Sequence, residues 1–439
     1  MPPEKVTVEK LVYGGEGLAH ANGETVFVPF VLTGEEAEVE ITERKKKLAR
    51  ARVARVLSPS PARILPRCPH FGACGGCDYQ HTSYDEQLRI KESILRETLR
   101  RIGRIDWKSP ITSHKSPPWE YRNRAQWKIQ PASGNAAHIR GTPHKSNIGY
   151  FRARSSALCP VEVCYIISPK LFETFTQIRE ALASGNLPSE LREVEAFANA
   201  TGTELLLNVT CSSLPRNREA LLDKLAELIP AAASILLQDS AGSQMALHGP
   251  GFLQYNALGK SFRVAHLSFF QVNRFLLEDL ACTVSNLAGT GSAALDLYAG
   301  VGLFTLSLAE KFASVATVES HPVAARDLEI NAGASGKSIA IHNQPVKEFM
   351  HRRTATSKSS APDVVVADPP RAGLDDGVAE QLARLSPPRI VYVSCDPATL
   401  ARDLATLRNQ AYTLREIHLF DMFPQTYHIE SALLLERAR

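Results

Sequence analysis

Three cysteines in the first fifth of the chain are spaced so that their thiols can share one metal centre. Cys68, Cys74 and Cys77 follow a C-x5-C-x2-C pattern with glycines between them. Glycine lets the backbone come close to a bound group. Thiolates bind zinc and iron–sulfur clusters alike, so the spacing leaves the metal open. The candidates for a fourth ligand are Cys159, Cys164 and, with zinc, His70 or His81.

Another cysteine, Cys395, stands where a strand is expected to end and a helix to begin. Pro397 suits the first helical position and Asp396 suits the N-cap. The partial positive charge of a helix N-terminus favours the thiolate, whereas the neighbouring carboxylate opposes it, so the net effect on the thiol stays open. A cysteine at the mouth of a sheet is a candidate nucleophile that adds to an electrophilic carbon and later leaves.

Two carboxylates also stand at the boundaries of expected strands. Asp368 follows a buried strand within Asp-Pro-Pro-Arg, and Glu430 lies in His-Ile-Glu just before an apolar run. Open α/β sheets bind ligands at the carboxyl ends of their strands. If Cys395 adds to a ring, a base such as Glu430 must take up a ring proton. The plainer alternatives are a simple turn at Asp368 and a surface position for Glu430.

A glycine-rich turn opens the same region. Asp296-Leu-Tyr298-Ala-Gly-Val-Gly302 closes one strand, and Glu319 ends the next strand 23 residues after Asp296. The glycines admit a nucleotide-like ligand, and a carboxylate such as Glu319 can accept both ribose hydroxyl hydrogens. The spacing is not Gly-x-Gly-x-x-Gly, which makes a dinucleotide less suitable. The pattern favours S-adenosylmethionine over the alternative of a tight turn without a ligand.

These motifs lie on alternating strands and helices that begin near residue 266. Apolar strands between helices predict a parallel, doubly wound sheet, that is, a Rossmann-like α/β domain. Residues 351–362 are polar and are expected to form a surface loop. The expected strands are 293–297, 314–319, 363–368 and 389–394, and the expected helices are 303–312 and 322–333.

The first 265 residues divide into two further domains. Residues 1–57 alternate with period two, contain the hairpin signal Asn22-Gly23, and predict a small antiparallel, OB-like β-barrel. Seven bases between Arg44 and Arg55 form either a solvated edge or a stripe that contacts phosphates. Residues 58–265 are read as the cysteine segment and an α+β middle domain. Its expected helices are 84–103, which is basic and amphipathic, 169–185 and 214–228.

Composition limits the class of protein. The 439 residues are 44% hydrophobic and 22% charged, with a net charge of 50 − 46 = +4, which excludes global disorder and a wholly basic nucleic-acid coat. No apolar run reaches about 18 residues, and the N-terminus lacks a signal core. We therefore expect a cytoplasmic protein without a membrane partner, whose cysteines are thiols or metal ligands.

Taken in order, the motifs resemble those of one family over nearly the whole chain, the bacterial RNA (uracil-5-)-methyltransferases, and within it the branch that acts on 23S ribosomal RNA. The resemblance implies transfer of a methyl group from S-adenosylmethionine to carbon 5 of a uridine. The motifs that carry it are Cys68-x5-Cys74-x2-Cys77, Phe269-Phe-Gln271-Val-Asn273, Asp296 to Gly302, Asp368-Pro-Pro-Arg, Ser394-Cys395-Asp-Pro and His428-Ile-Glu430.

The resemblance also implies residue roles. Cys395 would be the nucleophile and Glu430 the proton acceptor. Residues 1–57 would be a TRAM module that binds RNA. Gln271, Tyr298, Glu319 and Asp368 would line the donor and target-base site. Cys68, Cys74, Cys77 and Cys159 would hold a 4Fe-4S cluster, because Cys159-Pro-Val looks like the family's fourth ligand, which leaves Cys164 spare.

The expected partner is RNA, and the protein is expected to act as a monomer. Ribosomal RNA is favoured because bacterial tRNA-modifying relatives typically lack the barrel and the cluster, while archaeal relatives that carry both can act on tRNA. The basic helix 84–103 and the segment Tyr121–Arg124 are expected to hold the RNA. Two departures bear on donor binding: Leu303 stands where many relatives have Asn or Thr, and Gln344-Pro345 stands near the expected adenine contact.

Two rival functions have to be separated from this one. A non-catalytic RNA-binding assembly factor with a structural metal site would not need Cys395 or Glu430. A DNA cytosine methyltransferase also adds a thiolate to carbon 6 of a pyrimidine, but its cysteine usually follows proline, whereas Ser394 precedes Cys395 here.

Overall fold

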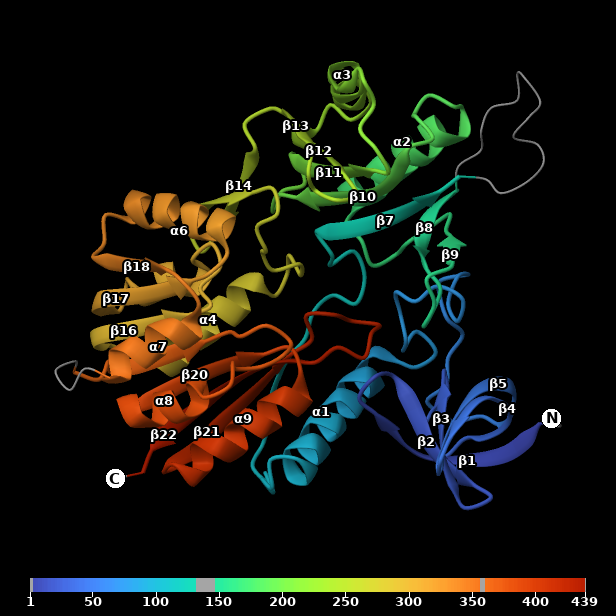
Figure 1. The fold of residues 1–439 in the computed structure, drawn as a ribbon. Coiled ribbons are helices and arrows are strands. Elements are labelled where there is room, and N and C mark those ends of the chain that lie inside the picture. Colours follow the sequence, from blue (N-terminus) through green and yellow to red (C-terminus); the bar gives the residue numbers. More distant parts are fainter. Residues whose placement is uncertain (1–2, 132–146, 356–359, 439) are drawn as a thin grey trace.

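The computed structural model describes residues 3–131, 147–355 and 360–438. Figure 1 shows three parts: a blue barrel next to the N-terminus, a green central domain above it, and a larger layered domain coloured from yellow to red. Helix α1 (Tyr84–Arg101) lies between the barrel and the large domain. Among the helices described, none combines the length and the apolar character that a membrane crossing requires.

The N-terminal barrel confirms the predicted architecture. Five strands close in the order β1-β2-β3-β5-β4 around a core of small apolar side chains. Asn22 and Gly23 both have positive φ, 51° and 78°, as the expected hairpin turn requires. One pair departs from an antiparallel barrel, because β3 and β5 run parallel. The strands are β1 (Glu4–Val12), β2 (Glu16–Ala21), β3 (Glu24–Pro29), β4 (Glu36–Lys45) and β5 (Leu48–Ser58).

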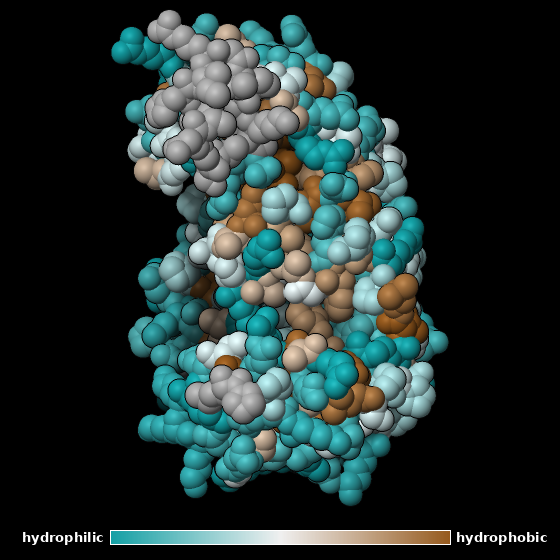
Figure 2. Space-filling view, turned by 90° about the vertical axis from the view of Figure 1, so that its right-hand side faces the viewer, coloured by the Kyte–Doolittle hydropathy of each residue, from teal (hydrophilic) through white to brown (hydrophobic). Residues whose placement is uncertain are grey.

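The basic stripe on β4 and β5 is mostly neutralised within the barrel. Arg52 pairs with Glu40 and Arg55 with Glu38 across the β4–β5 ladder. Arg44 and Arg50 also contact carboxylates of the barrel, on Glu4, Glu24 and Glu16. The lysines of the hairpin tip, 45–47, are exposed and form no ion pair within the described chain. The lower part of the face in Figure 2, where the barrel lies, is mostly hydrophilic.

The central domain is an α+β layer. A seven-stranded sheet has the order β13-β12-β11-β10-β7-β8-β9, and two helices cover it. Both helices lie where the sequence predicts them: α2 (Pro169–Ala183) and α3 (Arg218–Leu228). The strands are β7 (Arg124–Gln130), β8 (Asn147–Phe151), β9 (Leu158–Pro160), β10 (Leu191–Ala198), β11 (Leu205–Cys211), β12 (Ala232–Asp239) and β13 (Met245–His248).

The large domain is built on an eight-stranded sheet of order β18-β17-β16-β19-β20-β22-β21-β6. The first five strands run parallel, as predicted. Strand β22 runs antiparallel between β20 and β21, so the sheet is mixed. The strands are β6 (Thr112–His114), β16 (Gly291–Leu297), β17 (Phe312–Glu319), β18 (Ile339–Asn343), β19 (Val364–Ala367), β20 (Arg389–Ser394), β21 (Tyr412–Phe420) and β22 (Glu430–Arg437).

Helices cover both faces of this sheet. The predicted helix 303–312 is shorter, because α5 ends at Leu308 and β17 begins at Phe312. The predicted loop 351–362 is partly helical, because α7 continues to Ala355, and residues 356–359 lie outside the described ranges. The helices are α4 (Leu277–Ala288), α5 (Leu303–Leu308), α6 (Pro322–Ser335), α7 (Val346–Ala355), α8 (Val378–Leu385) and α9 (Pro397–Asn409).

The predicted boundary at residue 265 does not coincide with the packing. Helix α1 shares a hydrophobic core with α8 and α9, and β6 extends the large sheet at its β21 edge. The hairpin of β14 (Phe252–Ala257) and β15 (Lys260–Ala265) packs in the core next to α4 and α5. Segments of the region 58–265 therefore belong to the large domain.

A buried ion pair attaches α1 to the large domain. Lys91 and Asp421 have fully buried side chains, and Lys91 Nζ lies 2.6 Å from Asp421 Oδ1 and 3.0 Å from the Phe423 carbonyl oxygen. Lys91 was expected among the RNA-contacting bases of the helix, and this expectation is wrong because its ammonium faces the protein interior. Arg96 and Arg101 are also engaged, with Glu92 and Glu97.

We predict that Lys91→Met destabilises the protein by about 3–5 kcal/mol, because it leaves the buried Asp421 carboxylate without a counter-charge. The matched control is Arg89→Met on the same helix, whose exposed pair with Glu86 should change stability by less than about 1 kcal/mol. Urea unfolding followed by circular dichroism measures both. Equal losses in the two variants would contradict this account of α1.

Candidate active site and cysteine-lined cavity

The antiparallel pairing of β20 with β22 brings the two proposed catalytic residues together. Ser394 at the end of β20 pairs with Ser431 near the start of β22. Cys395 follows the first serine and Glu430 precedes the second, so the two side chains leave the ladder at the same edge. Asp368 reaches this edge from the parallel neighbour β19. The structure thus gathers Cys395, Glu430 and Asp368, which the sequence separates by up to 62 positions.

Cys395 lies in a short loop that the N-terminus of α9 holds in place. Asp396 is the N-cap, and its Oδ1 accepts hydrogen bonds from Ala398 N at 2.9 Å and Thr399 N at 3.0 Å. Burial raises the pKa of the Cys395 thiol to about 12, and the charges of Glu430 and Asp368 add to this shift. Burial and the neighbouring carboxylates therefore favour the protonated form of the Cys395 thiol.

The carboxyl groups beside the thiol are desolvated as well. Burial, and then the charge of Asp368, holds the pKa of Glu430 well above its ordinary value. Burial raises the pKa of Asp368 to about 7. The positive charge of Arg371 acts in the opposite direction and lowers the pKa of Cys395 and of Glu430. Its guanidinium also lies 3.4 Å from His428 Nδ1, and burial together with this cation lowers the pKa of His428 to about 3.

The glycine-rich turn has the strained geometry expected of a ligand cradle. Tyr298, Gly300 and Gly302 all have positive φ, of 62°, 56° and 99°. A positive φ is unfavourable for tyrosine and is typical of functional sites that the surrounding fold constrains. The turn is therefore held in a fixed arrangement at the carboxyl end of β16, where Gly300 N donates to the Glu319 carboxylate and Gly302 N to the Ala299 carbonyl oxygen.

Two acids frame this turn. Asp296 is fully buried; Thr305 Oγ1 donates to its Oδ2 at 2.5 Å, while its Oδ1 has no hydrogen-bond partner. Burial raises the pKa of Asp296 to about 7. Glu319 accepts hydrogen bonds from Gly300 N at 2.8 Å and His321 N at 2.6 Å. Each carboxylate oxygen can accept two hydrogen bonds, so Glu319 retains capacity for ribose hydroxyls.

The remaining donor-site expectations have mixed outcomes. Gln271 lies on the loop before α4, is largely buried, and its side chain makes no hydrogen bond to the described residues. Tyr298 directs its hydroxyl to Asp375 Oδ2 at 3.3 Å. Leu303 packs in the hydrophobic core, which explains an apolar residue at that position. Gln344 N donates to the Glu319 carbonyl, so this segment borders the same edge of the sheet.

The cysteine motif lines a separate cavity of about 250 Å³ in the central domain. Cys68, Cys74, Cys77 and Cys164 all lie on its wall. Burial raises the pKa of Cys74 to about 12, with smaller contributions from the charges of Cys164, Cys159 and Cys68. Cys159, the fourth ligand that the resemblance implies, is not on this wall. It is buried on β9 in the domain core, whereas Cys164 lies beyond the strand.

The cavity does not resemble a single-ion site. Tetrahedral zinc with bonds of about 2.3 Å needs its sulfur ligands within about 4 Å of one another. Within the described ranges, no group of three or more histidine, cysteine, aspartate or glutamate side chains could hold one metal ion. His70 lines the cavity but accepts a hydrogen bond from Glu162 N, and His81 is buried next to the Val31 carbonyl group. Neither histidine completes a zinc site.

Sequence reasoning missed two residues of these sites. Arg371 was seen only as the last letter of Asp-Pro-Pro-Arg, although a cation among several acids is a signal in itself. Tyr13 of the barrel contacts the loop of Cys395, with its hydroxyl 3.4 Å from the Cys395 carbonyl oxygen. No local sequence pattern identifies such a contact between distant segments.

Comparison with known proteins agrees with this geometry. The family model described as tRNA (Uracil-5-)-methyltransferase matches residues 252–438, and the TRAM domain model matches residues 4–54. The chain is 35% identical over 449 residues to a protein of Aquifex aeolicus described as an uncharacterized RNA methyltransferase, covering 99% of this chain and 98% of that protein.

A solved structure has the same fold. The Pyrococcus abyssi tRNA (uracil-54, C5)-methyltransferase, in complex with S-adenosyl-L-homocysteine, aligns with a TM-score of 0.74 at 24% identity, over 98% of this chain and 100% of that one. The near-complete match to the Aquifex relative and the two domain matches agree on the family. The chain therefore belongs to the RNA (uracil-5-)-methyltransferases, which take their methyl group from S-adenosylmethionine.

Proposed function

We propose that this enzyme methylates carbon 5 of a specific uridine in 23S ribosomal RNA through a covalent bond between Cys395 and carbon 6 of uracil. The observation that carries the proposal is the β20–β22 pairing, which sets the Cys395 thiol beside the Glu430 carboxyl group. A thiol beside an acid at a ligand-binding sheet edge fits addition to a ring followed by removal of a proton.

The residues divide the chemistry as follows. Cys395 loses its proton and its sulfur bonds to carbon 6, which makes carbon 5 nucleophilic. S-adenosylmethionine supplies the electrophilic methyl group that carbon 5 accepts. Glu430 then takes the carbon-5 proton, the ring double bond re-forms, and the bond between carbon 6 and sulfur breaks. Besides Glu430, the charges of Asp368 and Asp396 act on the Cys395 thiol, and our proposal assigns the thiol proton to Asp368, which follows β19 at the same sheet edge.

The donor site suits a cationic ligand. Burial raises the pKa of Asp296 and of Asp368, and the charges of Asp368 and Glu319 add to the shift at Asp296. A positively charged donor would lower the cost of ionising these groups. Glu319 is suited to the ribose hydroxyls, and the peptide groups of the turn that ends at Gly302 to the rest of the nucleoside. We also propose that Gln271 and Tyr298 line this site.

We further propose that Cys68, Cys74, Cys77 and Cys159 hold a 4Fe-4S cluster, the set that the resemblance implies. Three of these thiols line one cavity, and the charge of the buried Cys159 acts on Cys68 and Cys74, which supports a single shared centre. A cationic centre would also deprotonate thiols whose pKa values burial raises. The cavity is separate from the sheet edge of Cys395, so its proposed role is to brace the central domain.

The proposed RNA class rests on domain content. A TRAM barrel and a cysteine cavity occur together here, and relatives that modify tRNA in bacteria typically lack both. The alternative is a tRNA uridine, because the P. abyssi enzyme that aligns over nearly the whole chain is named for tRNA uracil-54. Mapping 5-methyluridine in both RNA pools, with and without the gene, tests the choice: loss in 23S RNA alone supports it, and loss in tRNA alone refutes it.

Variants of Cys395 and Glu430 should stop the reaction at different steps. Cys395→Ala should form no covalent RNA complex, because it has no thiol to add to carbon 6. In Glu430→Gln, the Cys395 sulfur should still add to uracil and carbon 5 should receive the methyl group. The carbon-5 proton should then remain, because the base is missing. An RNA adduct that carries label from the methyl group and survives a denaturing gel should therefore accumulate in Glu430→Gln. Turnover by Cys395→Ala would refute the covalent mechanism.

Cys164 and Cys159 form a matched pair for the cluster. Cys159→Ala should reduce the iron content and the brown absorbance of anaerobically purified protein, because it removes the proposed fourth ligand. Cys164→Ala should keep both, since Cys164 lies on the cavity wall but outside the proposed ligand set. Iron analysis and the visible spectrum measure the difference. Stoichiometric zinc in the wild-type protein, or iron loss in Cys164→Ala alone, would contradict the proposed ligand set.

The lysines at the tip of the β4–β5 hairpin should supply the barrel's contact with phosphates. Replacing residues 45–47 with alanine should weaken RNA binding and reduce the slope of log K against log salt by about 2, because three unpaired charges are removed. The control is the double variant Arg52→Ala/Glu40→Ala, which removes an internal pair and keeps the net charge. Salt titrations of binding measure both, and equal slopes in all three proteins would rule out this role.

A further inference from the structure

The turn between β1 and β2 brings the barrel into contact with the loop that contains Cys395. It consists of Tyr13, Gly14 and Gly15, and the two glycines have φ of 103° and 80°. A side chain at Gly15 would also bring its Cβ to 3.0 Å from Asp78 Cβ. Two glycines therefore let the chain reverse tightly against the segment that follows the cysteine motif, with Tyr13 at the front of the turn.

Tyr13 contacts the two loops that carry the proposed catalytic residues. Its hydroxyl donates a hydrogen bond of 3.4 Å to the carbonyl oxygen of Cys395. Its ring packs edge-on against Tyr427, with 5.4 Å between the centroids, and Tyr427 lies three residues before Glu430. Burial, and then the charge of Asp396, holds the pKa of Tyr13 above its ordinary value, so its hydroxyl remains protonated and can donate.

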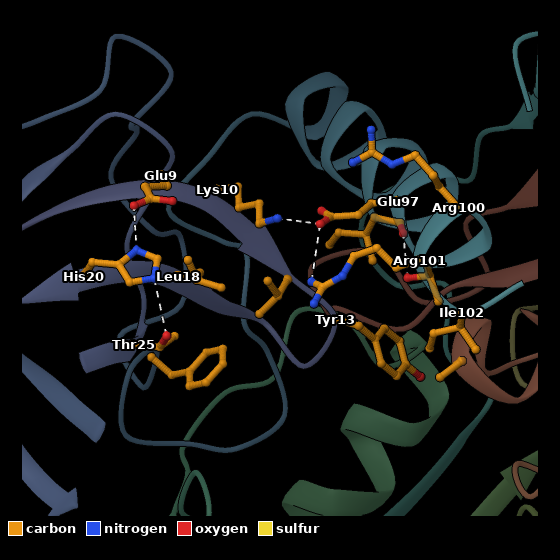
Figure 3. Close-up of a pocket in the computed structure, with 15 residues that line it drawn as sticks. Glu9, Lys10, Tyr13, Leu18, His20, Thr25, Glu97, Arg100, Arg101 and Ile102 are labelled. Atoms are coloured by element: carbon orange, nitrogen blue, oxygen red, sulfur yellow. Dashed lines mark hydrogen bonds and ion pairs between the residues drawn. The ribbon is translucent and has the colours of Figure 1, made fainter. Parts of the chain in front are cut away.

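Other contacts hold this turn against the rest of the molecule. Lys10 on β1 pairs with Glu97 on α1, and Arg154 pairs with Glu16 at the start of β2. Between the barrel and α1 lies an open groove of about 940 Å³, which Tyr13 and Ala398 of α9 help to line. Figure 3 shows Lys10 bonded to Glu97 across this groove, with Tyr13 and Ile102 among the residues that line it.

The Cys395 carbonyl depends on this contact. Ser394 Oγ braces the loop from within by hydrogen bonds to the Asp396 backbone, at 3.0 Å to its oxygen and 3.2 Å to its nitrogen. Within the described part of the chain, Tyr13 makes the one hydrogen bond to the carbonyl oxygen of Cys395. At 3.4 Å this hydrogen bond is long, and the Tyr13 hydroxyl also interacts with the side chain of Asp396 in the same loop. Long hydrogen bonds at catalytic sites without substrate commonly tighten on binding.

We propose that Tyr13 is a positioning residue for the nucleophile, through which the barrel sets the orientation of the Cys395 peptide group. The proposal rests on the proposed role of Cys395. The barrel then contributes to the chemical step as well as to RNA affinity. Deleting residues 1–57 would mix the two contributions, so a single hydroxyl group has to be removed instead.

The test is Tyr13→Phe, which keeps the ring against Tyr427 and removes only the donor. The probe is RNA transcribed with 5-fluorouridine. A base cannot remove the carbon-5 fluorine as it removes a proton, so the adduct persists. Formation of the adduct at saturating RNA and S-adenosylmethionine should slow by about three- to tenfold, the worth of one hydrogen bond. The dissociation constant for RNA should change by less than about twofold, because no phosphate contact is removed.

The matched control is Tyr412→Phe. Tyr412 Oη also donates to a backbone carbonyl, that of Pro387 at 2.8 Å, but at the start of β21, away from Cys395. It should form the adduct at the wild-type rate. A wild-type rate in Tyr13→Phe would overturn the proposal, as would slowing that appears only as weaker RNA binding, or loss of the folded state. Absence of an adduct in the wild-type protein would instead refute the covalent mechanism.

Discussion

The reversed direction of one strand is the constraint on which the site depends. Because β22 enters the sheet antiparallel to β20, its first residue meets the residue that follows β20, and Glu430 comes beside Cys395. A parallel strand at this position would begin at the opposite edge. The arrangement concentrates acids where water is scarce, and the cost appears as raised pKa values at Glu430, Asp368 and Asp296. This cost is tolerable if the ligand that enters is itself cationic.

Local sequence was sufficient for features that neighbouring residues determine. The Asn22-Gly23 turn, the capped helix after Asp396 and the glycine-rich turn before Gly302 all follow from backbone preferences within a few positions. Features set by distant partners were not accessible in this way. The burial of Lys91 depends on Asp421, 330 positions later, and the neutralisation of Arg52 depends on the register of two strands.

The cysteines illustrate the same limit at short range. Cys159 and Cys164 are five positions apart, and sequence likeness favoured the first. In the structure Cys159 is buried on β9, while Cys164 follows the strand and lies on the cavity wall. Which side a residue faces depends on where the strand ends, and strand ends are the least predictable part of a sequence pattern. Residue type identifies the chemistry, whereas the choice between the two thiols depends on packing around the strand end.

The place of β22 has a consequence for biosynthesis. This strand ends at Arg437, yet it lies inside the sheet, between β20 and β21. Both flanking strands precede β22 in the chain and stay without their partner until β22 has been synthesised and has inserted, while the N-terminal barrel can already fold. Glu430 takes its place only with that insertion. A chain truncated before β22 should contain every other motif yet have an open sheet, prone to aggregation through its unpaired edges.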